Sequence, residues 1–403
     1  MAATRRRLGP AAVMALVTAI GTAGCGKPRP VSVATADPCF PPEPGDEVAA
    51  DTVVLAMPTA GAPDDDHGLV DPASRFLVSA THRPLVWIDC HGRAVAALAA
   101  SWRRDDAGGA WTFSLAAGPD GAEVRDRWRD AAGGRAWPWP GIAEVTVLGA
   151  RILRVQLVIP RPELPVEFAD RRLAVPSPAL GPVIRVVPIL PAADQRNLLD
   201  PGQTPRIDLL FSRDPTTIDY ARSRAEWRVV PLPWDRLYLL VTAAPLPKDP
   251  AVGAATIESV RGDARVPVGP PWWSARPDCD LRPEPRPGAP RPEVAFLAGD
   301  PVARDLAERM VAVGVPPSPI RLRAVSLDSA RLAAVLEDGG VAGVIVADPV
   351  QPPLGCSGRP WSTRAPFRYP LLETRAHLIV RRGVGPLTID RDGTVRFRQP
   401  GQP

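Results

Sequence analysis

Proline interrupts this chain so often that long helices and long strands are excluded from most of its length. The sequence holds 52 prolines among 403 residues, about 13% where about 5% is usual. They are spread along the chain without a repeat, which excludes a collagen-like helix and does not fit a single disordered tail. Because proline fixes φ and has no amide hydrogen to donate, the sequence predicts many fixed loops that join short elements.

The rest of the composition is typical of a folded globular protein. Hydrophobic residues make up 45% of the chain and charged residues 23%, and the length suffices for two domains with a large core. Lys27 and Lys248 are the only lysines, so arginine carries nearly all of the positive charge. The net charge is +4, and no basic run lies beside an aromatic RNA-binding pattern. We therefore expect no nucleic-acid partner.

The amino terminus predicts export. Arg5, Arg6 and Arg7 precede an apolar stretch over 11–20, which is too short to span a bilayer. The following Thr-Ala-Gly-Cys is similar to the bacterial lipobox, which implies a signal peptide over 1–24 and a lipid anchor on Cys25. The expected location is then the cell envelope, outside the cytoplasm. Ordinary cleavage, which leaves Cys25 as a free thiol, is the alternative.

Four further cysteines suggest disulfides. Cys39, Cys90, Cys279 and Cys356 form an even set, as expected of a protein in an oxidising compartment. Of the three possible pairings, we expect Cys39 with Cys90 and Cys279 with Cys356, since each pair stays within one half of the chain. A metal site is not expected, because the adjacent Cys90 and His91 lack the spacing of a ligand pair.

Short apolar runs predict a series of strands after a proline-rich tether over 25–46. A helix is predicted to begin at Asp71-Pro72, with aspartate at the cap and proline in the first turn. The predicted strands are Thr52–Met57, Leu85–Ile88, Ala110–Leu115, Glu144–Leu148, Ile152–Ile159, Ile207–Phe211, Leu237–Val241 and Ala376–Val380.

The pattern changes near residue 294, where strand and helix signals begin to alternate. Strands over 294–298, 320–325 and 341–347 are separated by a helix over 301–313 and a second helix that ends at Leu336 before Gly339-Gly340. This β-α-β-α-β order predicts a small parallel sheet.

Several segments together resemble a known family. The early run reads Arg83-Pro-Leu-Val-Trp-Ile-Asp89, and Gly92-Arg93, Leu98-Ala-Ala-Ser-Trp102 and Trp111-Thr-Phe113 follow it. This pattern is similar to the early signature of family 5 extracellular solute-binding proteins, the peptide- and nickel-binding group that serves ABC importers. The stretches Ile207-Asp-Leu-Leu, Asp214-Pro and Val229-Val-Pro-Leu resemble its middle strands, and 294–349 resembles its second-lobe α/β segment.

The resemblance implies an α/β, periplasmic-binding-protein-like fold of type II, with mixed sheets and two lobes that close over a cleft. The small parallel β-α-β-α-β unit would belong to the second lobe. The expected division is a first lobe over 47–235, a second lobe over 236–350 and a return to the first lobe over 351–403.

The sequence also suggests ligand-binding residues. Asp348, in an Ala-Asp-Pro setting, resembles the place where peptide-binding members put an aspartate for the peptide amine; the alternative is a plain Asp-Pro turn. Tryptophans in proline- or glycine-rich loops could line a cleft, or they could fill the core. The candidate tryptophans are Trp137, Trp234, Trp272 and Trp273.

No catalytic group of residues emerges from the sequence. Neither a Gly-x-Ser-x-Gly elbow, nor a His-Glu-x-x-His motif, nor a glycine-rich phosphate loop is present, so we expect no enzyme, no cofactor and no metal. The expected function is a monomeric, membrane-anchored solute-binding protein that passes a peptide-like ligand to an ABC permease.

The alternative function is a degenerate relative that serves as an envelope scaffold or a partner-binding lipoprotein. The stretch from Gly121 to Ala132 keeps little of the family pattern, and the usual helical region after Asp348 is reduced. These departures favour the alternative, whereas the two-lobe pattern favours solute binding.

Overall fold

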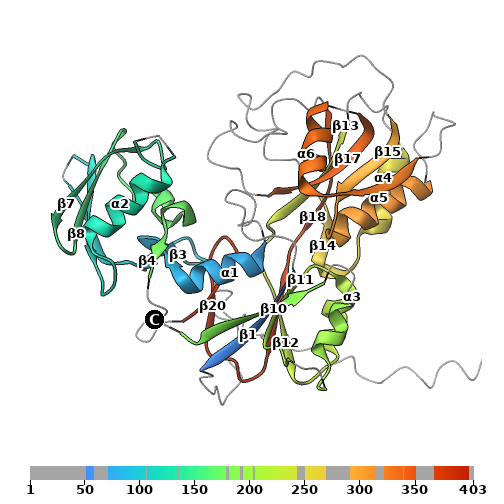
Figure 1. Ribbon diagram of the computed structural model, residues 1–403, viewed down its shortest axis with the longest axis horizontal. Helices are drawn as coiled ribbons and strands as arrows, with labels where there is room; N and C mark the ends of the chain where they lie inside the picture. The colour runs from blue at the N-terminus through green and yellow to red at the C-terminus, as the bar shows by residue number, and fades with distance from the viewer. Residues whose placement is uncertain are drawn as a thin grey trace, which may run out of the picture. The chain divides into compact units, whose positions relative to one another are not determined.

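The computed structural model is a mixed α/β protein with several sheets (Figure 1). It describes residues 51–58, 71–105, 107–133, 136–177, 181–190, 194–202, 205–242, 250–268, 291–313, 322–338, 340–350 and 367–398. Among these residues, no helix is long and apolar enough to cross a membrane.

A five-stranded sheet has the order β10-β1-β11-β19-β12. Strand β1 runs parallel to β10 and β11, and β19 is antiparallel to β11 and β12. Its strands are β1 (Thr52–Pro58), β10 (Val183–Ile189), β11 (Leu209–Ser212), β12 (Trp227–Pro231) and β19 (His377–Arg381). Helix α1 (Pro72–Thr81) contacts β1 and β11, and α3 (Pro215–Arg222) contacts β12 and β19.

Both of these helices begin where the sequence places a cap. The Asp71 carboxylate accepts hydrogen bonds from the amides of Ala73 and Ser74, and Asp214 does the same for Thr216 and Thr217. In each case proline follows in the first turn, where it loses no hydrogen bond. The helix predicted at Asp71-Pro72 is thus confirmed.

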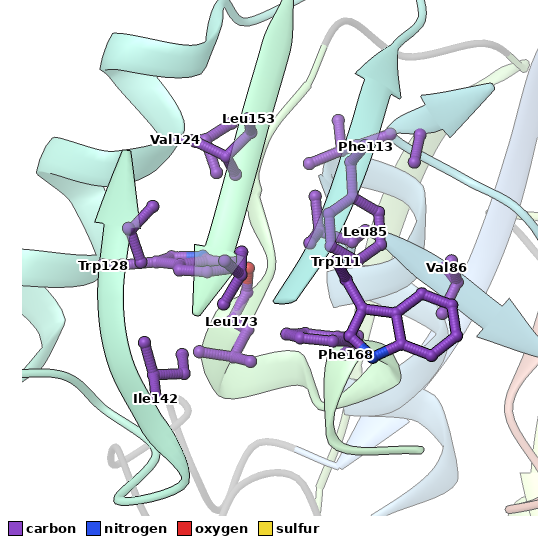
Figure 2. Close-up of a cluster of buried hydrophobic side chains, with 14 of the residues drawn as sticks. Leu85, Val86, Trp111, Phe113, Val124, Trp128, Ile142, Leu153, Phe168 and Leu173 are labelled. Atoms are coloured by element: carbon purple, nitrogen blue, oxygen red, sulfur yellow. The ribbon is translucent and has the colours of Figure 1, made fainter. Parts of the chain in front are cut away.

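A four-stranded antiparallel sheet in the order β5-β6-β8-β7 packs against α2 (Gly121–Ala131). The strands are β5 (Ala99–Arg104), β6 (Ala110–Leu115), β7 (Ile142–Gly149) and β8 (Ile152–Leu157). Figure 2 shows its core, where Trp128 of α2 lies among the side chains of the sheet. The Trp128 indole Nε1 donates to the Leu173 carbonyl oxygen at 2.7 Å, so this buried donor is satisfied.

The third large sheet has six strands in the order β14-β18-β13-β17-β15-β16. Its strands are β13 (Arg236–Thr242), β14 (Arg265–Pro267), β15 (Arg291–Leu297), β16 (Arg323–Leu327), β17 (Val341–Pro349) and β18 (Phe367–Thr374). The predicted β-α-β-α-β unit is confirmed here, because β15 is parallel to both β16 and β17.

The strand order explains where the helices of this sheet lie. The chain moves outward from β15 to β16 and then back across β15 to β17, so right-handed crossovers place the two connecting helices on opposite faces. Helix α5 (Pro301–Val313) packs on the face of Val294 and Phe296, and α6 (Ser329–Asp338) packs on the face of Ala295. Helix α4 (Pro250–Ser259) lies beside α5 (Figure 1).

Smaller elements complete the described chain. The two-stranded sheets pair β2 (His82–Arg83) with β9 (Val175–Pro176), β3 (Val86–Ile88) with β4 (Ala94–Ala96), and β20 (Leu387–Ile389) with β21 (Val395–Phe397). The 3-10 turns are η3 (Val166–Ala169), η4 (Arg171–Leu173), η5 (Gln195–Leu199) and η6 (Gly262–Ala264).

Two short segments connect the five-stranded sheet with the six-stranded sheet. The first leads from β12 to β13 over residues 232–235, and the second leads from β18 to β19 over residues 375–376. Strand β18 pairs with β13 and β14. The six-stranded sheet therefore includes residues up to Thr374, and the division into lobes at residues 235 and 350 stays a prediction.

Candidate functional site

Asp235 lies in the first connecting segment and binds two buried arginines. Arg213, which follows β11, donates from Nη1 to Oδ1 and from Nη2 to Oδ2, each at 2.7 Å. Arg75 of α1 donates from Nη2 to Oδ2 at 2.8 Å. All three side chains are at most 10% exposed. Burial favours the neutral acid, but the charges of Arg213 and Arg75 outweigh it and hold the pKa of Asp235 below its ordinary value.

Arg213 joins both connecting segments. Besides its ion pair with Asp235, its Nη1 donates to the Thr374 hydroxyl at 3.3 Å, at the end of β18. Backbone hydrogen bonds connect the same segments. The amide of Asp235 donates to the Thr374 carbonyl at 3.4 Å, and the amide of Leu232 donates to the Ala376 carbonyl at 2.9 Å. Both segments are thus fixed to one another by side chains and by main chain.

A second polar group lies where β13 begins. The Tyr238 hydroxyl donates to the Asp300 carboxylate, with distances of 3.0 and 2.9 Å to its two oxygens. Arg236 Nη1 lies 3.8 Å from Asp300 Oδ2. Burial raises the pKa of Tyr238, so the hydroxyl stays protonated and available as a donor.

Asp300 is also the cap of α5, the first helix of the parallel unit. Its Oδ1 accepts hydrogen bonds from the amides of Val302 and Ala303, each at 3.0 Å. Gly299, with φ of 85°, provides the left-handed turn that brings the chain from β15 into this cap. Asp300 therefore stands at the carboxyl end of a parallel strand, the edge where open α/β sheets bind ligands.

Asp348 stands at the same edge, on the neighbouring parallel strand β17. It lies inside the strand, opposite Leu237 of β13, and its side chain is fully buried. Because directly opposite residues project from the same face of a sheet, Asp348 shares the face of Leu237. Asp348 and Pro349 thus lie in an extended strand and not in the Asp-Pro turn that was the alternative interpretation.

Trp234 lies in the first connecting segment, next to Asp235. The guanidinium of Arg375, from the second segment, stacks over its indole at 4.7 Å from the ring centroid. Arg375 also donates through Nη2 to Asp263 Oδ2 at 3.0 Å, and the buried His377 places Nε2 3.3 Å from Asp263 Oδ1. Trp234 is thus in the first connecting segment and contacts the second through Arg375.

The remaining sequence candidates divide into two groups. Trp137 belongs to the core of the four-stranded sheet, is 7% exposed and donates from Nε1 to the Ala143 carbonyl, which favours the core interpretation. Cys90 is disulfide-bonded; its pairing with Cys39 stays a prediction. The candidates outside the described residues are Cys25, Cys39, Trp272, Trp273, Cys279 and Cys356.

No sequence pattern predicts the ion pairs that Arg75 and Arg213 form with Asp235. Each is an isolated charged residue in a chain where arginine and aspartate are common, and the partners are separated by 22 to 160 positions. The proline that follows each of Asp214 and Asp300 marks a helix cap, but no local pattern marks an ion pair between remote segments.

These polar groups hold the backbone segments around them. The described carboxylates near the connecting segments are held by arginine, tyrosine or backbone donors, and no group of three or more His, Cys, Asp or Glu residues in the described ranges could hold a metal ion. Fixed charges of this kind hold backbone segments in place.

Comparison with known proteins identifies the fold through solved structures. No family model matches the sequence, and no curated protein matches it significantly. The chain aligns with NikA from Staphylococcus aureus in complex with Ni(L-His)2 at a TM-score of 0.58 and 11% identity, over 86% of this chain and 98% of NikA.

A dipeptide-binding protein and an ABC transporter-associated periplasmic binding protein align over the same extent. One, from Pseudoalteromonas sp. SM9913 in complex with Met-Leu, gives a TM-score of 0.56 at 10% identity. The other, DppA from Helicobacter pylori in complex with the peptide STSA, gives 0.55 at 13% identity. Each alignment covers 86% of this chain and 98% of the other. The resemblance noted in the sequence is therefore confirmed at the level of the fold: this chain has the fold of the periplasmic solute-binding proteins of ABC transporters.

Proposed function

We propose that this protein is a solute-binding component of an ABC importer. The observation that carries the proposal is the fold, which aligns along 86% of the chain with binding proteins for nickel complexes and peptides. Two connecting segments between two sheets, as found here, also provide the kind of hinge about which such proteins close.

The proposed ligand is peptide-like and carries an ammonium group, for which Asp348 provides the carboxylate. A carboxylate removed from water gains strongly from a cationic partner, and Asp348 is fully buried at the carboxyl end of β17. Trp234, half-buried beside the connecting segment, is the described tryptophan that we propose to contact the ligand. Trp272 and Trp273 remain candidates from the sequence.

The proposed setting follows from the sequence. A signal peptide over 1–24 and a lipid on Cys25 would hold the protein on the outer side of a membrane, where it would meet its permease as a monomer. No cofactor and no catalytic residue is part of this proposal.

A thermal-shift screen of the purified full chain tests it. The panel consists of dipeptides to pentapeptides, simple sugars and the nickel–histidine complex, each at several concentrations. The stabilisation that a ligand gives to a binding protein grows with the logarithm of the ligand concentration above Kd, so we expect Tm to keep rising with the concentration of at least one class of peptide. A flat response to the whole panel would contradict solute binding and favour the scaffold function.

A further inference from the structure

The two connecting segments are bound to different sheets. Asp235, which ends the first segment, is bound by Arg213 at the end of β11 in the five-stranded sheet. In the second segment, the amide of Arg375 donates to the Ala264 carbonyl at 3.1 Å, and its Nε donates to the Asp263 carbonyl at 2.8 Å. Both acceptors belong to η6, which leads directly into β14 of the six-stranded sheet. A rotation of one sheet against the other would therefore pivot at these segments.

An ion pair connects the two sheets outside the connecting segments. Arg222, the last residue of α3, donates from Nη2 to Asp263 Oδ1 at 3.2 Å and to Oδ2 at 3.0 Å. Helix α3 contacts β12 and β19 of the five-stranded sheet, whereas Asp263 lies in η6, beside the six-stranded sheet. Each partner thus belongs to a different sheet, so a rotation about the connecting segments separates them.

This ion pair can open at a small cost in free energy. Both side chains are 42% exposed, so water can solvate the two charges after they separate, and exposed pairs contribute little stability. Asp263 also keeps a cationic partner, because Arg375 donates from Nη2 to its Oδ2 at 3.0 Å. The pair of Arg213 and Asp235 differs in this respect. Its side chains are at most 10% exposed, and separating them would leave a charge buried.

We propose that the ion pair of Arg222 and Asp263 is a reversible latch that holds the two sheets at one relative angle. The buried pair of Arg213 and Asp235 keeps the pivot in place, and the exposed pair selects the angle. The latch rests on the proposed function in so far as it requires the hinge motion of a solute-binding protein. It requires no solute, so it can be tested on the protein alone.

Small-angle X-ray scattering of the full chain without ligand tests the latch, because a change in the angle between the sheets changes the scattering curve. In Arg222→Gln, the ratio of latched to unlatched molecules should fall about two- to fivefold, the factor expected for loss of an exposed ion pair. The curve should then show a second orientation beside that of the wild type. Arg222→Lys keeps the charge and should restore most of the wild-type curve.

The matched control is Arg196→Gln. Arg196 pairs with Asp194 at a similar exposure, 49% and 38%, but both residues lie at the start of η5, so the curve should not change. A change as large as that of Arg222→Gln would contradict the latch.

Identical curves for Arg222→Gln and the wild type would overturn the proposal. If Arg222→Gln does not fold, the wild type decides: 1 M sodium chloride screens an exposed ion pair and should shift the curve, so an unchanged curve between 0.05 and 1 M would overturn the latch. Either negative result would leave solute binding standing, and a flat thermal-shift screen would leave the latch standing.

Discussion

Arg213 and Asp235 form a two-point ion pair in which both guanidinium Nη atoms lie 2.7 Å from separate carboxylate oxygens. Arg213 follows a strand of the five-stranded sheet, and Asp235 directly precedes a strand of the six-stranded sheet. The ion pair therefore links the five-stranded sheet to the six-stranded sheet. Asp235 also directly precedes β13, the strand in which Leu237 lies opposite Asp348.

Loss of this ion pair should destabilise the protein. Arg213→Gln leaves a buried carboxylate with Arg75 as its remaining guanidinium partner, and we expect the free energy of unfolding to fall by about 3 kcal/mol, at the lower end of the range for a broken buried pair. Chemical denaturation measures the effect. Arg331→Gln, which breaks an exposed pair, should cost less than about 1 kcal/mol. Equal losses in the two variants would contradict the role given to Arg213.

The core of the four-stranded sheet should be sensitive to truncation. Phe113 is fully buried, and its ring meets that of Phe168 edge to face at 5.0 Å between centroids (Figure 2). Phe113→Ala should lower the free energy of unfolding by about 3–5 kcal/mol, because it leaves a cavity. The matched control is Val158→Ala, at a side chain that is 59% exposed, with an expected change within about 0.5 kcal/mol. A loss below 1 kcal/mol for Phe113→Ala would argue against this packing.

The sequence predicted local elements well. Helix α5 matches its predicted range of 301–313, strand β6 matches 110–115, and the parallel unit has the predicted order. These elements have strong local signals, namely apolar periodicity, an aspartate cap and glycine stops. Helix α2 was missed because it carries few apolar residues, of which Val124 and Trp128 are buried.

The contacts around the candidate site are harder to predict from the sequence than the helices and strands. Asp348 is a candidate because its setting resembles that of the family, and its burial inside a strand cannot be read from the Ala-Asp-Pro sequence. Long-range pairing of charges is decided by topology, so no window of sequence contains it.

Acid should weaken the contact made by Asp263. Burial raises the pKa of this carboxyl, but the hydrogen bond from Arg222 and the charge of His377 outweigh it and lower the pKa to about 2. Since the folded pKa lies below the ordinary value of about 4, the stabilisation is present above that pH and is lost as the pH falls toward 2.

The comparison that isolates this effect is between the wild type and Asp263→Asn. The wild type should be more stable at pH 5, and its advantage in free energy of unfolding should shrink as the pH falls from 5 to 2. Denaturation curves at several pH values measure the difference. An advantage that stays constant over this range would show that the Asp263 carboxylate does not carry the contact.

Calorimetric titration with a tetrapeptide library in two forms, with free and with acetylated amino termini, tests solute binding at Asp348 most directly. We predict that the wild type binds the free-amine library at least tenfold more tightly than the acetylated one, and that Asp348→Asn removes this preference. Equal affinity of the wild type for both libraries, or no binding of either, would contradict the account.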